Sequence, residues 1–120
     1  MRLWLTLAAL LGFVSVAAGA FAAHGMSDAR SQELLRTGSL YAFVHVLAVF
    51  AAAGLVQMGA GRAGLAPPLF LAGVVVFSGS LYALAFGAPR WAGAITPIGG
   101  LAFLAGWLAL AWAAWGLARP

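Results

Sequence analysis

Four long apolar stretches, almost free of charge, cover most of the 120 residues of this chain. They run over residues 3–23, 40–60, 63–89 and 91–118, with the third stretch read from about residue 69. An α-helix rises about 1.5 Å per residue, so roughly 20 apolar residues cross the hydrocarbon core of a bilayer, which is about 30 Å thick. Each stretch is long enough to cross it. The sequence therefore predicts a membrane protein with several spans.

The composition supports this prediction and argues against a nucleic-acid partner. The chain is 65% hydrophobic and 7% charged, whereas about a quarter of the residues of a soluble domain carry a charge. The formal charge of +4 comes from isolated arginines at the edges of the apolar stretches, a pattern typical of membrane-interface anchors. These are Arg2, Arg30, Arg36, Arg62, Arg90 and Arg119. The sequence has no cysteine, which excludes disulfides, thiolate chemistry and iron–sulfur ligation.

The N-terminal stretch resembles a signal peptide in part. Arg2 precedes an apolar run, and small residues at 18–20 imitate a cleavage site. The apolar character continues to residue 23, however, and a run of this length favours a retained first helix.

The connections between the stretches contain most of the charges and helix breakers. Residues 24–38 predict a short helix at the membrane surface, capped by Asp28 or Ser31, that leads into the second span. Residues 59–64, followed by Pro67 and Pro68, and residues 87–90 predict tight turns. At 96–97, either Thr96 caps the last helix or Pro97 kinks a helix that begins near residue 91; we favour the cap, where the missing N–H of proline costs nothing.

These features predict an all-α fold, an integral-membrane antiparallel four-helix bundle with short loops and a single domain. The expected spans are approximately 3–23, 40–60, 69–87 and 97–117. Lipid is as apolar as leucine, so close backbone approach and interhelical hydrogen bonds must hold the helices together. Small residues at i, i+4 and i+8 are candidates for that approach: Ser15, Gly19 and Ala23; Gly79, Ala83 and Gly87; Ala105, Ala109 and Ala113.

The polar residues of the spans gather at one of the two membrane faces when the chain is traced through its crossings. They form the candidate polar cluster: His24, Tyr41, His45, Ser78, Ser80, Tyr82 and Thr96. An unpaired polar group in hydrocarbon costs several kcal/mol. We therefore expect His24, Tyr41 and His45 to converge with at least one of Ser80, Tyr82 or Thr96 inside the bundle.

The two histidines leave several chemical interpretations open. His24 and His45 are a conceivable pair of haem ligands, and His45 with Tyr41 is a conceivable proton relay. A divalent metal would need further ligands, which only Asp28 or Glu33 offers. The structural alternative is that both imidazoles hydrogen-bond between helices. No nucleophile–base pair, phosphate loop or carboxylate pair can be assembled, so we expect neither enzymatic activity nor a cofactor or metal centre.

Several motifs resemble those of the YgdD-like family of small inner-membrane proteins, whose domain has no known function. The segments that carry the resemblance are residues 19–25 (GAFAAHG), Tyr41 with His45, residues 77–82 (FSGSLY), residues 96–100 (TPIGG) and residues 103–107 (FLAGW). They follow the order and spacing of the family over essentially the whole chain. One departure is Ala22, where the family usually has glycine. The resemblance implies a four-helix membrane protein and no particular activity.

We therefore expect a non-enzymatic, multi-pass inner-membrane protein with a structural or accessory role, whose polar cluster binds a small molecule, a lipid headgroup or a partner helix. The alternatives are a small-solute or proton carrier that uses His24 and His45, and a haem- or quinone-associated subunit of a redox complex. The expected partners are the lipid bilayer and other membrane proteins or a second copy of the chain. Three arginines are expected on each membrane face, so the count used by the positive-inside rule is equal for the two faces. The charge of the amino terminus then favours cytoplasmic termini.

Overall fold

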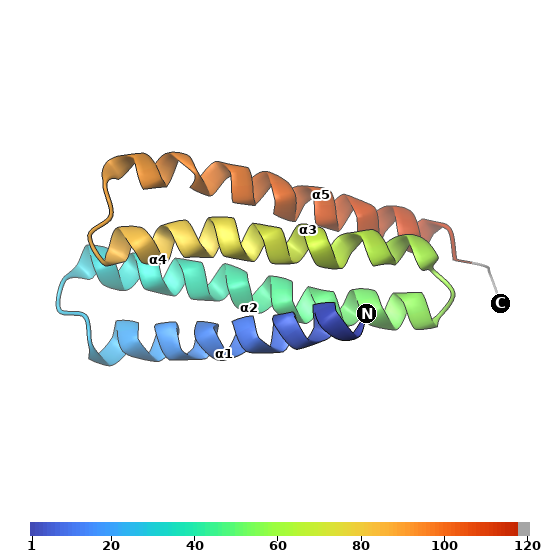
Figure 1. Ribbon diagram of the computed structural model, residues 1–120, viewed down its shortest axis with the longest axis horizontal. Helices are drawn as coiled ribbons and strands as arrows, with labels where there is room; N and C mark the ends of the chain where they lie inside the picture. Colours follow the sequence, from blue (N-terminus) through green and yellow to red (C-terminus); the bar gives the residue numbers. More distant parts are fainter. Residues whose placement is uncertain (118–120) are drawn as a thin grey trace.

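The computed structural model describes residues 1–117 as four helical rods joined by short connections (Figure 1). The first two rods are α1 (Arg2–His24) and α2 (Ala29–Gln57). The third rod joins η1 (Gly61–Leu65), α3 (Ala66–Gly73), the π-helical η2 (Val74–Ser78) and α4 (Gly79–Ala85), and the fourth joins η3 (Arg90–Ala94) and α5 (Thr96–Trp115). All four rods are long and apolar enough to cross a membrane, which confirms the predicted fold class. Arg119, which entered the topology prediction, lies outside the described residues.

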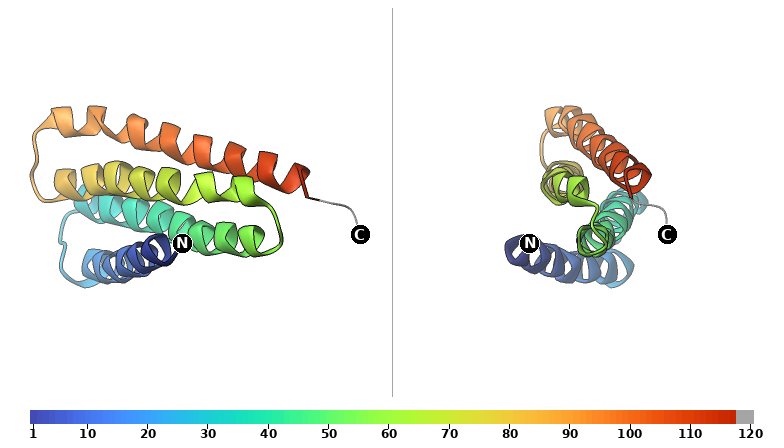
Figure 2. Two further views of the ribbon diagram at one scale, coloured as in Figure 1. Left: turned by 45° about the vertical axis from the view of Figure 1, so that its right-hand side comes forward. Right: turned by 90° about the vertical axis from the view of Figure 1, so that its right-hand side faces the viewer.

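The four rods are stacked as layers rather than placed at the corners of a square. The α2 helix and the α3–α4 rod form the centre, α1 packs mainly on α2, and α5 packs mainly on α3 and η2. The end-on view shows α1 and α5 on opposite sides of the central pair (Figure 2). The two outer helices are consequently the least buried, and much of their surface is left for lipid.

Small residues at seven-residue spacing bring the outer helices onto the centre. In α1 the buried positions are Ala8, Ser15 and Ala22. In α5 they are Gly99, Phe103, Gly106, Leu110 and Ala113, an alternation of three and four residues. This is the spacing of left-handed packing, in which side chains of one helix enter the spaces of its neighbour.

Phenylalanine rings of the third rod pack against glycines of the fourth, and the reverse also holds. A Cβ atom on Gly106 would lie 2.5 Å from the Phe70 ring, and one on Gly73 would overlap the Phe103 ring. At Gly99 a Cβ atom would overlap the backbone nitrogen of Phe77. The closest helix contacts in this half of the molecule thus depend on the absence of a side chain.

The small-residue ridges predicted at four-residue spacing are largely wrong. Ser15 and Ala113 are buried, but Ala23 and Ala105 are exposed, as is the whole ridge of the third helix: Gly79, Ala83 and Gly87. The π turn of η2 is one physical reason, because each residue added to a helical turn rotates the next part of the helix by about 100°. The sequence carries no signal that announces this turn.

Two helix starts also differ from the predictions. Asp28 caps α2 itself by accepting a hydrogen bond from the backbone N–H of Ser31, so the expected surface helix is the first part of one continuous helix. At the start of α5 the cap position is Ile95, and Thr96 is already helical, with Pro97 in the first turn. Thr96 does not cap the helix because its hydroxyl is hydrogen-bonded to Ser80.

Two glycines allow the tight turns after α2 and α4. Gly59 and Gly87 both have a φ of +99°, a conformation that other residues rarely adopt. The residue after each glycine closes the turn: Ala60 N–H donates to the carbonyl oxygen of Leu55, and Ala88 N–H to that of Ala83, both at 2.9 Å. These bonds satisfy carbonyl groups at the helix ends and reverse the chain without a long loop.

Candidate functional site

His45 lies at the centre of the molecule and uses both nitrogens of its ring. Its Nδ1 lies 2.6 Å from the carbonyl oxygen of Tyr41, and its Nε2 lies 2.9 Å from the indole nitrogen of Trp107. A carbonyl oxygen only accepts and an indole N–H only donates, so Nδ1 carries the proton and Nε2 accepts. These two bonds hold the imidazole neutral, in one tautomer, between α2 and α5.

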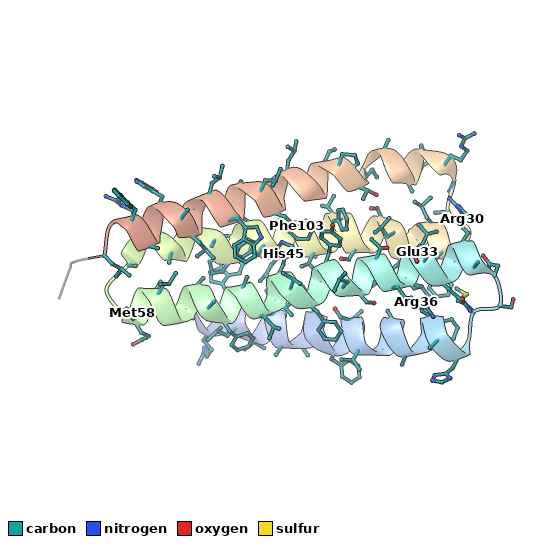
Figure 3. All side chains as sticks on the ribbon, turned by 180° about the vertical axis from the view of Figure 1, so that it is seen from behind. Arg30, Glu33, Arg36, His45, Met58 and Phe103 are labelled. Carbon is teal, nitrogen blue, oxygen red and sulfur yellow. The ribbon has the colours of Figure 1, made fainter. Side chains whose placement is uncertain are left out.

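Aromatic rings enclose this imidazole. Phe103 of α5 stacks on it with ring centroids 3.6 Å apart and an interplanar angle of 9°. Phe70 and Trp107 approach at 5.4 Å and 5.8 Å with tilted or edge-on rings. His45 is only 4% exposed, and Figure 3 shows it beside Phe103 near the middle of the long axis. The imidazole is thus a packed component of the interior, fixed by rings on several sides.

Four other side chains of the predicted cluster form separate hydrogen bonds: Ser78, Ser80, Tyr82 and Thr96. Ser78 donates to the carbonyl oxygen of Gly38 at 2.6 Å, and the hydroxyls of Tyr82 and Ser39 lie 3.0 Å apart. These two bonds join α2 to η2 and α4. The Ser80 hydroxyl donates to Phe77 O at 2.8 Å and is also hydrogen-bonded to the Thr96 hydroxyl, which joins α4 to the start of α5.

The structure does not bring His24 to this cluster, so the prediction of one convergent site is wrong. His24 is exposed at the end of α1. The interior near it is filled by an apolar cluster that contains Ala22 and Leu35. Leu35 precedes His45 by about ten residues, or about 15 Å along a helix axis. The remaining polar residues are spread over three helix contacts rather than around one cavity.

The sequence reasoning missed two site residues, Ser39, the partner of Tyr82, and Trp107, the partner of His45. Tryptophan in a membrane protein is usually found at the two interfaces, whereas Trp107 lies in the middle of α5. An indole N–H that is shielded from water needs an acceptor, and His45 provides the acceptor in this structure. A mid-span tryptophan was therefore an available signal for a polar partner on another helix.

A groove with a volume of about 440 Å³ lies beside His45 between α2, η2 and α5. It is open because α2 and α5 touch each other little. Two further grooves, of about 230 and 470 Å³, lie between α1 and the third rod. The residues along the first groove are Tyr41, His45, Phe77, Pro97, Gly100, Leu101, Phe103, Leu104 and Trp107.

Among residues 1–117, the charged side chains belong to the ends of the rods, away from His45. Figure 3 shows Arg30, Glu33 and Arg36 near one end of the long axis and Met58 near the other. Next to the first group, the hydroxyl and the backbone N–H of Ser31 lower the pKa of the Asp28 carboxyl from its ordinary value of 3.8. Asp28 therefore stays ionised at neutral pH and keeps its place as the cap of α2.

The residues present do not fit the metal or haem sites considered from the sequence. Among residues 1–117, no three histidine, cysteine, aspartate or glutamate side chains gather as a metal ion would require. A pair of histidine ligands to haem would need His24 and His45 to face each other, but they lie at different depths of the molecule. In addition, the Nε2 atom of His45 already accepts from Trp107.

Four apolar rods tied by hydrogen bonds between hydroxyl, imidazole, indole and backbone groups define a small multi-pass integral membrane protein. Comparison with known proteins assigns the chain more closely. A family model described as "Protein of unknown function (DUF423)" matches residues 18–100. The chain belongs to this family, which confirms the resemblance found in the sequence motifs.

Curated relatives agree with the family model over nearly the whole chain. The chain is 47% identical over 112 residues to a UPF0382 membrane protein of Haemophilus influenzae, with 91% of this chain and 90% of the relative covered. It is 42% identical over 110 residues to the UPF0382 inner membrane protein YgdD of Escherichia coli, covering 88% and 84%. It is 38% identical over 119 residues to the UPF0382 membrane protein YwdK of Bacillus subtilis, covering 95% and 97%. No solved structure is significantly similar. The protein is a multi-pass protein of the inner membrane.

Proposed function

We propose that this protein is a non-enzymatic accessory component of the inner membrane, in which the polar side chains of the spans build a rigid frame. The observation that carries the proposal is the bonding of His45, whose two nitrogens are both engaged within the protein. A general base needs a free lone pair within reach of its substrate. In His45 the lone pair of Nε2 is directed at Trp107 instead.

The remaining hydrogen bonds support the same role. Ser78 with Gly38, Tyr82 with Ser39 and Ser80 with Thr96 connect three of the four rods. Interhelical hydrogen bonds are one of the few forces that hold helices together in lipid. Their positions at three separate contacts favour a frame over a shared reaction centre.

The carrier alternative has less support. A proton path that uses both histidines would have to connect exposed His24 with buried His45 across the apolar cluster around Leu35. A carrier also needs a group that changes its partners as it transports. The bonds of His45 to one carbonyl and one indole, in a stack of rings, favour a single arrangement.

An accessory protein acts through a surface that it presents. We take the groove between α2 and α5 as that surface, because His45 and Trp107 of the frame border it together with Phe103. Its position on the side of the molecule leaves it accessible from the bilayer. Membrane-soluble molecules can therefore reach it without entering water.

The proposal is tested in a strain that lacks the gene, using whatever phenotype the deletion gives. The His45→Gln variant should restore the wild-type phenotype, because an amide can donate to Tyr41 and accept from Trp107 but does not titrate near neutral pH. Thermal stability in detergent should stay near that of the wild type. A well-folded His45→Gln protein that fails to complement the strain would instead show that the imidazole itself is needed, as proton transfer requires.

A further inference from the structure

The groove between α2 and α5 has the size and the opening of a small-molecule site. Its volume of about 440 Å³ falls within the range of about 300–1,000 Å³ that is typical of ligand pockets. Gly100 keeps one side of it open, because a Cβ atom added there would find no atom within 4 Å. A flat or chain-like molecule can therefore enter from the lipid beside Gly100.

Aromatic rings form the inner part of this groove. The Tyr41 ring lies 4.8 Å from Phe77 and 6.3 Å from Phe103, both measured between ring centroids. The planes of Tyr41, His45 and Phe103 are nearly parallel, with interplanar angles of 8°, 9° and 15°. Parallel rings of this kind offer flat faces and edges that suit a planar ligand better than a flexible chain.

The Tyr41 hydroxyl differs from the other polar groups beside this groove. Trp107 and His45 are bonded to each other, whereas no hydrogen bond is found for the Tyr41 hydroxyl among residues 1–117. The side chain is 43% exposed and lines the groove. Where a bound molecule shields it from water, a hydroxyl without a partner costs free energy, and an acceptor atom on that molecule removes the cost.

We propose that this groove binds a planar ring that carries a carbonyl oxygen and an apolar tail, the chemistry of a prenyl quinone. The Tyr41 hydroxyl donates to the ring carbonyl, and the ring lies against the Phe77 and Phe103 side. The tail follows Leu101 and Leu104 out to the lipid. This inference rests on the proposed function, since the frame keeps the groove in shape, and it concerns binding alone, without a redox step.

The depth of the groove suits such a molecule. Tyr41 precedes His45 by one helical turn, about 6 Å nearer to the face that holds Arg30 and Arg36. A ring carbonyl bonded to Tyr41 would therefore lie on the polar side of the groove. The lining nearer the middle of the molecule is apolar apart from the His45–Trp107 pair, as an isoprenoid or alkyl tail requires.

The test measures binding of decylubiquinone to the full-length protein in lipid nanodiscs, through quenching of its tryptophan fluorescence. Trp107 borders the groove and serves as a built-in reporter. Wild-type protein should show saturable quenching. Tyr41→Phe, which keeps the ring, should weaken binding about three- to tenfold, the loss expected for one hydrogen bond. Gly100→Leu should abolish the saturable part by filling the groove.

Gly79→Leu is the matched control. Gly79 also lies in a helix, lines the groove between α1 and η2, and has no atom within 4 Å of an added Cβ. This variant should bind decylubiquinone as the wild type does. The Tyr41→Phe comparison remains available if Gly100→Leu proves unstable, because phenylalanine preserves the packing.

Three results would overturn the inference. Quenching that does not saturate, or that is equal in Gly100→Leu and Gly79→Leu, would mean that decylubiquinone only partitions into the lipid and does not bind in the groove. Unchanged affinity in Tyr41→Phe would mean that the Tyr41 hydroxyl is satisfied at the membrane surface and does not bond to the ligand. Equal competition by decanol, which has the tail but no ring, would mean that the groove takes any alkyl chain. Each result leaves the complementation test of His45→Gln intact, so failure of the ligand is distinguished from failure of the frame.

Discussion

At the scale of single residues, His45 and Trp107 act as one unit. Removal of the indole N–H by Trp107→Phe leaves the Nε2 atom of His45 without a partner, while the ring contact near Phe70 is largely kept. We expect a loss of about 0.6–2 kcal/mol in unfolding free energy, the measured range for hydrogen bonds between membrane helices. Thermal or denaturant unfolding in detergent measures it.

A double-mutant cycle separates this bond from general packing. His45→Leu alone and Trp107→Phe alone should each destabilise the protein, and the double variant should be less unstable than the sum of the two. Additive losses would show that the two side chains contribute through packing with Phe103 and Phe70, and not through their mutual bond.

The sequence identified most of the polar residues that matter but grouped them incorrectly. Tracing the chain through its crossings places a residue at one membrane face, and this placement was sufficient to single out Ser78, Ser80, Tyr82 and His45. It does not give the direction around the helix axis. His24 therefore entered the cluster by depth alone, although it is exposed, and Trp107 was left out because tryptophan was not counted among the polar residues of the spans.

At the scale of helices, two neighbouring glycines of α5 have opposite surroundings. A Cβ atom on Gly99 would overlap the backbone of Phe77, whereas one on Gly100 would meet open space. Gly99→Ala should therefore destabilise the protein by about 1–3 kcal/mol, as overpacking does, because the backbone must shift. Gly100→Ala should change the stability by less than about 0.5 kcal/mol. Melting temperatures of the two variants in the same detergent provide the comparison.

The start of α2 should respond to pH through Asp28. Its pKa is lowered in the folded protein, so its contribution to stability is present above the ordinary value of 3.8 and is lost as the pH falls through the lowered value. Asp28→Ala should thus lower the melting temperature at pH 7 and have a smaller effect as the pH falls below that range. A difference that persists unchanged at the lower pH would rule out the carboxylate as the source.

The helices themselves were predictable because their length and apolar character are properties of the sequence alone. Their contacts were less so. The heptad spacing of Ala8, Ser15 and Ala22 was present in the sequence, yet the chain's 16 glycines offer many competing patterns. The π turn of η2 then changes which face of the third rod is inside, and no residue type marks it in advance.

At the scale of the whole molecule, the orientation in the membrane is open to a direct measurement. The native chain has no cysteine, so each introduced cysteine is unique. Ser27 and Met58 are exposed beyond opposite ends of α2. With both termini cytoplasmic, Ser27→Cys should react with a membrane-impermeant maleimide in intact cells, and Met58→Cys only after the cells are opened. The reverse pattern would place the termini in the periplasm.

The layered order of the rods also has a consequence for the timing of biosynthesis. Helix α1 packs on α2, which follows it directly, so the first hairpin can form while the rest of the chain is still being made. The bond between His45 and Trp107 joins residues 62 positions apart. At a synthesis rate of about 5–20 residues per second, Trp107 follows His45 by about 3–12 s. During those seconds the Nε2 atom of a newly inserted His45 lacks the indole N–H that donates to it in the finished protein.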